Sequence, residues 1–324
     1  MTPETGSNEP QQNTTAAASV RYDGRVAVVT GAGRGMGREF AILLAARGAA
    51  VVVNDVLPDD GGPDSAAATA RTIVGAGWTA IASDADITGP DAAASVVDLA
   101  VDTFGRIDIV INNAGNRRFK PFPELTDEDL DSLLDVHVRG TFHLTRRAWP
   151  HFQRQRYGRV LNVASIDGVV IGVPNHAGYG TCKGALAGLT RELAVEGAPD
   201  GIRANALLPG AATSHGMGAI EGKNYAPPIN VTPAIVAPGA CWLVHEECSA
   251  TGRVFSCSSG RMAEVFTRPG AGWQGHPDDF DLEHVRAHWE QIQSADEMAE
   301  VHTVEAWNSF RTQLYNQMLE SNTQ

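Results

Sequence analysis

Short runs of valine, isoleucine and alanine alternate along this chain with longer alanine-rich segments, and the alternation limits the folds it can adopt. Parallel strands need a crossover between them, usually a helix, and the intervening segments are long enough. The runs lack the polar alternation of a half-exposed strand, so we expect burial on both faces. The pattern predicts an α/β protein with one doubly wound parallel sheet of seven strands and helices on both faces. The predicted strands are 26–30, 51–54, 79–83, 107–112, 159–165, 202–208 and 253–257, and the predicted helices are 36–47, 65–75, 91–104, 127–155, 177–197 and 234–247.

Two segments outside these strands have a different composition. Residues 1–20 are rich in Pro, Gln, Asn, Ser and Thr, which is typical of a disordered tail. Residues 21–260 contain all the predicted strands without an internal repeat, so we expect a single domain. Residues 261–324 are expected to form a C-terminal extension, with an amphipathic helix at 282–293, that packs on the domain or on a dimer.

The charge balance excludes several classes of partner. The net charge is −13, with 38 acidic and 25 basic residues, which argues against binding to nucleic acid or to an anionic membrane surface. No stretch approaches the roughly 20 apolar residues of a membrane span. The four cysteines show no disulfide-framework spacing, which suits a reducing compartment. We expect a cytoplasmic protein whose partners are small molecules or copies of itself.

Three potential metal ligands fall on one face of the predicted helix 234–247. They are Cys241, His245 and Cys248. No fourth ligand stands at the spacing of a known metal site. We interpret the three as a buried helix face and predict no metal site.

A glycine-rich turn, TGAGRGMG at 30–37, connects the first predicted strand to an alanine-rich helix. Glycines let the backbone approach a pyrophosphate at a helix N-terminus, where N–H groups and the helix dipole favour negative charge. Asp55 closes the second strand, where a carboxylate binds the adenosine ribose and repels the 2′-phosphate of NADP. The turn therefore predicts a Rossmann-type dinucleotide site that prefers NAD. Arg34 argues for NADP, because its guanidinium could meet that phosphate.

Tyr179 is followed four residues later by Lys183, one of only three lysines in the chain. At random composition such a pair is expected only about 0.05 times. Positions i and i+4 share a helix face, so the ammonium lies one turn from the phenol and favours the phenolate. A tyrosine with a pKa near about 10 is too weak a base for pH 7 without such help. The pair predicts a general acid/base.

Together the motifs resemble the short-chain dehydrogenase/reductase family over about residues 22–260. The marks are TGAGRGMG, Asp86-Ile87, Asn112-Asn113-Ala114-Gly115, Ser165, Tyr179, Lys183 and Pro209-Gly210. The resemblance implies that Tyr179 exchanges the hydroxyl proton, that Lys183 lowers the pKa of Tyr179 and holds the nicotinamide ribose, and that Ser165 hydrogen-bonds the reacting oxygen. It implies that NAD is held by Gly31, Arg34, Gly35, Met36, Gly37, Asp55, Asp86, Ile87, Asn113, Ala114, Gly115, Tyr179, Lys183, Pro209, Gly210 and Thr213.

One position departs from the family pattern. The family usually has an asparagine in an N-x-x-G context on the fourth helix, and this chain reads His137-Val-Arg-Gly140. In the family the main-chain carbonyl at that position holds a water for proton relay to the lysine, and a histidine retains the carbonyl. His137 is therefore counted with the catalytic residues. The alternative is a histidine that only packs.

Several stretches are similar to the dehydrogenase domain of the multifunctional β-oxidation enzymes, also called 17β-hydroxysteroid dehydrogenases. They are VHVRGTFHLTRRAWPHF, VVVNDV, GRIDIVINNAG and WLVHEECSATGRVF. This resemblance implies that a (3R)-hydroxyacyl-CoA is oxidised to the 3-ketoacyl-CoA, or that a steroid alcohol is the substrate. The chain ends in SNTQ and not in a peroxisomal tripeptide, so we expect a free-standing bacterial enzyme that forms a homodimer or homotetramer.

Residues near the predicted site offer further hints about the substrate. The apolar stretch between Pro209 and Pro233 stands where the family has a mobile substrate loop. Arg117, Arg118 and Lys120 either meet coenzyme A phosphates or form a solvated loop. Two alternative functions stay open at this point: an NADPH-dependent 3-oxoacyl reductase, and a protein that binds NAD without turnover.

Overall fold

The computed structural model describes residues 19–58, 60, 62–211, 232–277, 280–295, 298–301 and 304–321. The chain divides into two compact units, 1–264 and 265–324. Residues 1–18 of the predicted disordered tail lie outside the described residues, as does most of the predicted substrate loop. The expectation that the extension packs on the domain or on a dimer stays a prediction.

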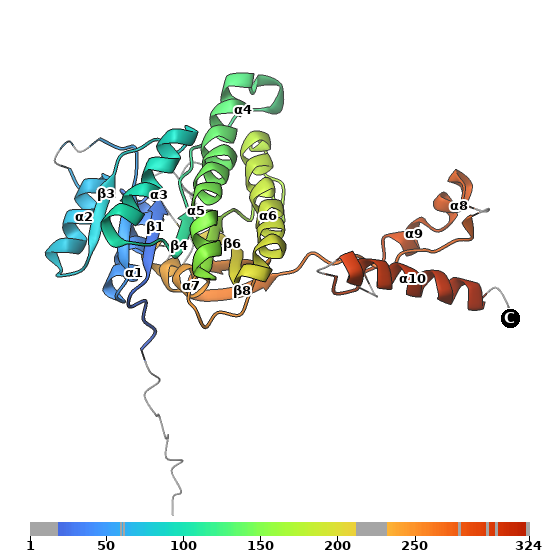
Figure 1. The fold of residues 1–324 in the computed structure, drawn as a ribbon. Helices are drawn as coiled ribbons and strands as arrows, with labels where there is room; N and C mark the ends of the chain where they lie inside the picture. The colour runs from blue at the N-terminus through green and yellow to red at the C-terminus, as the bar shows by residue number, and fades with distance from the viewer. Residues whose placement is uncertain are drawn as a thin grey trace, which may run out of the picture. The chain divides into compact units, whose positions relative to one another are not determined.

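The first unit is built on one eight-stranded sheet in the order β3-β2-β1-β4-β5-β6-β7-β8 (Figure 1). The first seven strands pair in parallel, and the order runs outward in both directions from β1 and β4. This arrangement confirms the predicted doubly wound α/β fold. The strands are β1 (Val26–Thr30), β2 (Ala50–Asn54), β3 (Ala80–Ser83), β4 (Ile109–Asn112), β5 (Gly158–Val163), β6 (Ile202–Gly210), β7 (Val254–Ser258) and β8 (Arg261–Val265).

The predicted number of seven strands was one too few, because β8 extends the sheet at its edge. Only Ser259 and Gly260 separate β7 from β8, with φ angles of 51° and 80°. A two-residue turn can join only antiparallel neighbours. Arg261 and Met262 are exposed, so β8 lacks the buried apolar run by which the other strands were recognised.

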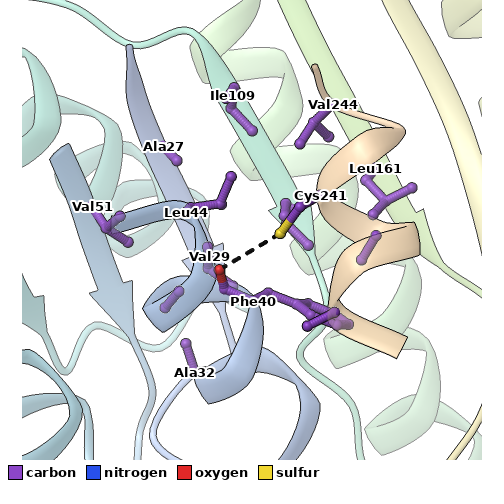
Figure 2. Close-up of a cluster of buried hydrophobic side chains, with 14 of the residues drawn as sticks. Ala27, Val29, Ala32, Phe40, Leu44, Val51, Ile109, Leu161, Cys241 and Val244 are labelled. Atoms are coloured by element: carbon purple, nitrogen blue, oxygen red, sulfur yellow. Dashed lines mark hydrogen bonds between the residues drawn. The ribbon is translucent and has the colours of Figure 1, made fainter. Parts of the chain in front are cut away.

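Helices cover both faces of the sheet, and neighbouring strand residues point to opposite faces. On one face Val29 packs with Leu44 and Cys241, from β1, α1 and α7, in the cluster that Figure 2 shows. On the other face Val28 packs with Val97 and Phe152, from β1, α3 and α5. The helices of this unit are α1 (Gly35–Ala46), α2 (Ala66–Gly75), α3 (Pro90–Phe104), α4 (Asp127–Leu134), α5 (Thr141–Gln155), α6 (Ala177–Gly197) and α7 (Ala237–Trp242), with the 3₁₀ turns η1 (Phe122–Glu124), η3 (Ala198–Asp200) and η5 (Pro233–Val236).

The long helix predicted at 127–155 contains an irregularity. Between α4 and α5 the chain winds through a π-helical turn, η2 (Asp135–Gly140), which buries His137 and Gly140. A π-helical turn adds a residue to the helical repeat and often marks a functional site. His137 therefore lies at a local widening of the helix.

The helix predicted at 234–247 is shorter in the structure. Helix α7 ends at Trp242, so His245 and Cys248 lie beyond it and share no helix face with Cys241. All three side chains are buried, and His245 contacts the Arg21 carbonyl at 3.0 Å through Nε2. Among the described residues no group of His, Cys, Asp or Glu side chains is arranged to hold a metal ion.

The second unit contains α8 (Leu282–Ala287), α9 (Trp289–Ile292) and α10 (Val304–Ser321). The helix predicted at 282–293 is thus interrupted at His288, whose ring stacks on Trp273 with centroids 4.1 Å apart. In neither unit does a described helix combine the length and apolar character needed to cross a membrane.

Candidate active site

The predicted site residues follow the carboxyl ends of five parallel strands or lie on helices that begin there. In a doubly wound sheet ligands bind at this edge, where the strand order reverses. In this sheet the reversal lies between β1 and β4. The residues are Gly31, Arg34, Gly35, Met36 and Gly37 after β1, Asp55 after β2, Asp86 and Ile87 after β3, Asn113, Ala114 and Gly115 after β4, and Ser165 after β5, with His137 on η2 and Tyr179 and Lys183 on α6.

The glycine turn leaves no room for side chains. A Cβ at Gly37 would lie 2.3 Å from the Gly31 carbonyl oxygen, and one at Gly31 would lie 2.8 Å from Ala114 Cα. Gly31 has a φ of 61°, in the left-handed region that favours glycine. The N-terminus of α1 has neither a side-chain cap nor an acidic residue, so its backbone N–H groups remain available to an anion. The turn therefore fits the pyrophosphate of a dinucleotide.

Asp55 is buried beneath this turn. Its carboxylate accepts hydrogen bonds from the Gly33 N–H at 2.9 Å and from the Leu57 N–H at 3.0 Å. A Cβ at Gly33 would lie 3.0 Å from the carboxylate, so glycine is needed for this approach. Two backbone donors thus hold Asp55 at the end of β2, where a ribose would bind. Arg34 lies on the other side of the turn, 3.9 Å from Asp64.

Hydrogen bonds join the glycine turn to the end of β4. The Asn113 amide donates to the carbonyl oxygens of Thr30 and Gly31 at 2.9 and 3.0 Å. The Thr30 hydroxyl in turn accepts from the N–H groups of Asn113 and Ala114. These contacts fix the two sides of the predicted cofactor site relative to each other. Thr30 is the first residue of the glycine motif, but no pattern in the sequence assigns this role to its hydroxyl.

The remaining predicted cofactor residues lie farther along the same edge. Asp86 is exposed and accepts a hydrogen bond from the Thr88 N–H, whereas Ile87 is buried against Gly140. Pro209 and Gly210 are the last two residues of β6, in register with β7. Thr213 lies outside the described residues.

Tyr179 and Lys183 lie one turn apart on α6, as their spacing predicts. The Lys183 ammonium lies 5.6 Å from the centre of the Tyr179 ring and donates to the Val163 carbonyl at 2.6 Å. Lys183 is buried, and burial lowers its pKa to about 7. A carbonyl does not neutralise a charge, so the amine is poised between its two protonation states near neutral pH.

The phenol of Tyr179 is also withdrawn from water. Burial raises its pKa above the usual value, while the charge of Arg117 and hydrogen bonding from Ser165 lower it. Ser165 follows β5, and its hydroxyl accepts from the Asp167 N–H at 3.2 Å. The structure thus brings together Ser165, Tyr179 and Lys183, the three residues assigned to proton exchange.

His137 packs edge-on against Tyr179, with ring centroids 5.6 Å apart. Its Nε2 lies 2.9 Å from the Asn116 carbonyl oxygen and 3.3 Å from the Asn116 nitrogen, and with the proton on Nε2 it donates to the nearer carbonyl. Nδ1 is buried and has no hydrogen-bond partner in the described part of the chain. Burial lowers the pKa of His137 to about 3, so the ring is neutral at pH 7. A Cβ at Gly115 would lie 2.5 Å from this ring, which explains the glycine.

Two aromatic side chains that the sequence did not link to the tyrosine stand against its ring. Phe119 and His176 stack on each other at 3.9 Å, and both stand edge-on to Tyr179. His176 is held by Asp167 through Nδ1 at 2.5 Å. The only sequence signal for His176 was its position three residues before Tyr179, at the start of α6.

The three basic residues of the loop after β4 have different environments. Arg118 lies 3.8 Å from the carboxylate of Asp129, and Lys120 lies 2.5 Å from it. Arg117 instead reaches the aromatic group, with its guanidinium carbon 5.9 Å from the Tyr179 ring centre. The hypothesis that these three residues together meet coenzyme A phosphates or form a solvated loop therefore has to be considered separately for Arg117 and for the pair at Asp129.

The geometry allows a buried phenol to exchange a proton with an alcohol beside a dinucleotide, and comparisons with known proteins agree. The profile of a family described as short chain dehydrogenase matches residues 25–224. The chain is 37% identical over 282 residues to the peroxisomal multifunctional enzyme type 2 of Mus musculus, covering 85% of this chain and 37% of that enzyme. It is 38% identical over 277 residues to a short-chain type dehydrogenase/reductase of Mycobacterium tuberculosis, covering 83% of this chain and 93% of that protein.

Solved structures show the same likeness. The full-length peroxisomal multifunctional enzyme type 2 of Drosophila melanogaster superposes with a TM-score of 0.77 and 28% identity, covering 92% of this chain and 51% of the enzyme. A short chain dehydrogenase from Mycobacterium avium superposes with a TM-score of 0.74 and 28% identity, covering 86% and 99% of the two chains. The chain therefore belongs to the short-chain dehydrogenase family, whose members are nicotinamide-dinucleotide oxidoreductases that act on CH–OH groups.

Proposed function

We propose that this protein oxidises the 3-hydroxyl group of (3R)-hydroxyacyl-CoA esters with NAD. The observation that carries the proposal is the grouping of Ser165, Tyr179 and Lys183 beside a glycine turn that fits a dinucleotide. The likeness to peroxisomal multifunctional enzymes and hydratase-dehydrogenase-epimerases supports the acyl-CoA as substrate. Steroid alcohols are the second substrate class that the resemblance implies.

In the proposed mechanism Tyr179 accepts the proton of the substrate hydroxyl. Ser165 hydrogen-bonds the substrate oxygen and keeps it within reach of the phenol. Lys183 stabilises the phenolate by its positive charge. Because its pKa is about 7, the amine exchanges between its charged and neutral forms near neutral pH. A nicotinamide dinucleotide held at the glycine turn from Gly31 to Gly37 would supply the hydride acceptor that these residues lack. His137 holds the Asn116 loop beside the ring of Tyr179.

The proposal names NAD because of Asp55. Its carboxylate, fixed by two N–H groups, stands at the end of β2, where it would repel a 2′-phosphate. Arg34 supports the rival, an NADPH-dependent 3-oxoacyl reductase, but the Asp64 carboxylate 3.9 Å away offsets part of its charge. Steady-state KM values for NAD and NADP decide between them, and a lower KM for NADP would overturn the choice of NAD.

A kinetic panel tests the substrate class. The (3R)- and (3S)-hydroxyacyl-CoA esters of rising chain length, and 17β-hydroxysteroids, are each incubated with the protein and NAD, and NADH is followed by its absorbance. We expect turnover of the (3R) esters and little of the (3S) esters. Binding of NAD without turnover of any alcohol would favour the third possibility, a non-catalytic NAD-binding protein.

Two further expectations belong to the proposal. A homodimer or homotetramer is expected from the family resemblance, and sedimentation of the purified chain measures it. A cytoplasmic location is expected from the sequence, and several of the relatives are named as peroxisomal. Microscopy of a tagged full-length chain in its native cell distinguishes the two locations.

A further inference from the structure

Lys183 alone is a weak activator for a half-buried tyrosine at neutral pH. Its pKa of about 7 means that about half of the molecules carry no charge there, and the fraction falls as pH rises. Tyr179 meanwhile loses hydration, which disfavours its phenolate. A second positive charge that persists above pH 7 would remove this difficulty.

Arg117 has the position and the charge for this role. Its guanidinium carbon lies 5.7 Å from the centre of the Phe119 ring and 5.9 Å from that of Tyr179. Its positive charge lowers the pKa of the Tyr179 phenol. A guanidinium keeps its charge at every pH at which enzymes are assayed.

The neighbours of Arg117 show why this residue differs from the rest of its loop. Arg118 and Lys120 share the Asp129 carboxylate, which offsets part of their charge, and Arg118 also donates to the Ser132 hydroxyl at 3.3 Å. For Arg117, by contrast, no ion pair with a carboxylate is found in the described part of the chain, and its guanidinium lies beside the rings of Phe119 and Tyr179.

We propose that Arg117, whose guanidinium lies beside the Tyr179 ring, stabilises through its charge the phenolate that accepts the substrate proton. The proposal rests on the proposed function of Tyr179 as the base. Arg117 transfers no proton itself. The charged and titratable groups that face Tyr179 are Arg117 from the loop after β4, His137 from η2, Asp167 from the loop after β5, and His176 and Lys183 from the start and body of α6.

Three variants of the full chain test the proposal. Arg117→Gln removes the charge, Arg117→Lys keeps a charge, and Arg118→Gln is the matched control at the Asp129 ion pair. The substrate is (3R)-hydroxybutyryl-N-acetylcysteamine, a thioester without the phosphates of CoA. We expect Arg117→Gln to lower kcat/KM at pH 7 about tenfold and to shift the acidic limb of its pH profile up by about one unit, since the phenolate then needs a higher pH. Arg117→Lys should retain most of the activity, and Arg118→Gln should stay within about twofold of wild type.

A second measurement needs no turnover. With ¹³C at Cζ of the five tyrosines, the NMR signal of Tyr179 is assigned as the one lost in Tyr179→Phe and is followed against pH. We expect Tyr179 to ionise about one unit higher in Arg117→Gln than in wild type. Coinciding titrations would overturn the proposal, as would a defect confined to the KM of CoA esters, which would make Arg117 a phosphate ligand. If wild type oxidises no alcohol, the proposed function fails, and the NMR titration still decides whether Arg117 stabilises the phenolate. Circular dichroism checks folding, and Arg117→Met replaces the glutamine variant should that variant not fold.

Discussion

Two half-buried tyrosines stand beside cations at opposite edges of the same sheet. Tyr157 precedes β5 at the amino edge, with the guanidinium carbons of Arg25 and Arg159 at 3.8 and 4.2 Å from its ring centre. Tyr179 lies at the carboxyl edge beside Lys183 and Arg117. Burial raises the pKa of both phenols, and neighbouring arginines lower it. Burial beside cations therefore does not by itself distinguish a reactive tyrosine.

The two edges differ in whether the cations beside the tyrosine are bound to carboxylates. At the amino edge Asp108 is fully buried and accepts hydrogen bonds from Arg106, Arg25 and the Val26 N–H. Asp108 and Glu246 oppose the effect of the arginines on the Tyr157 phenol. At the carboxyl edge Asp167 likewise opposes the effect of Arg117 on the Tyr179 phenol, but the Lys183 ammonium is bound to a carbonyl and not to a carboxylate. Paired charges stabilise the fold, whereas unpaired ones remain free to act on a substrate.

Replacing each tyrosine by phenylalanine tests this comparison with the largest expected effect. Tyr179→Phe removes the proton acceptor and should lower kcat by about a thousandfold, with NAD affinity nearly unchanged. Tyr157→Phe removes a buried hydroxyl that has no hydrogen-bond partner among the described residues, so activity should be retained. NADH formation and calorimetric titration with NAD measure both. Equal losses in the two variants would contradict the assignment of the base to Tyr179.

Removing the central carboxylate of the amino edge should affect stability and not chemistry. Asp108→Ala leaves the Val26 N–H and Arg106 without the carboxylate that they share and removes one of the two carboxylates of Arg25, and we expect the free energy of unfolding to fall by about 3 kcal/mol. Glu246→Ala is the matched control, because that carboxylate also pairs with Arg25 but its side chain is 54% exposed. Its loss should cost less than about 1 kcal/mol. Urea unfolding measures both, and equal costs would show that burial of Asp108 is irrelevant.

The pH dependence of stability should reveal the unpaired charge of Lys183. Its pKa of about 7 lies below the unfolded value of about 10.4, so unfolding takes up a proton in this window and stability rises with pH. Between pH 7 and 9 wild type should gain about 2 kcal/mol relative to Lys183→Met. Lys120→Met should follow wild type, because Lys120 contacts water in the folded state too. Parallel curves for wild type and Lys183→Met would contradict the burial of a titrating amine.

The sequence predicted the parts of the site that depend on local pattern. The alternation of short apolar runs with longer helical segments predicts the parallel sheet. The tight packing of Gly31 and Gly37 against neighbouring backbone is the physical reason for the glycine motif. The spacing of Tyr179 and Lys183 follows from one helical turn. Each of these features is encoded within a few consecutive residues.

What the sequence did not predict depends on contacts between distant segments. The π-helical turn at 135–140 has the same apolar spacing as an ordinary helix, so no residue marks it. The stack of Phe119 on His176 joins two loops that only the sheet brings together. Arg117 and Arg118 are adjacent and chemically identical, and only Asp129 distinguishes them. A single chain read alone contains no signal for such choices.

The smallest expected effect is that of replacing His137, whose ring packs against Tyr179. Its pKa of about 3 leaves the ring neutral at pH 7, so replacing it removes no charge from the site. Asparagine keeps the main-chain carbonyl and can donate to the Asn116 carbonyl, as Nε2 does now. His137→Asn should therefore change kcat by no more than about threefold and add no limb to the pH profile between pH 5 and 9. If turnover were abolished while NAD affinity and folding stayed intact, the unpaired Nδ1 would be the proton acceptor that the geometry leaves open.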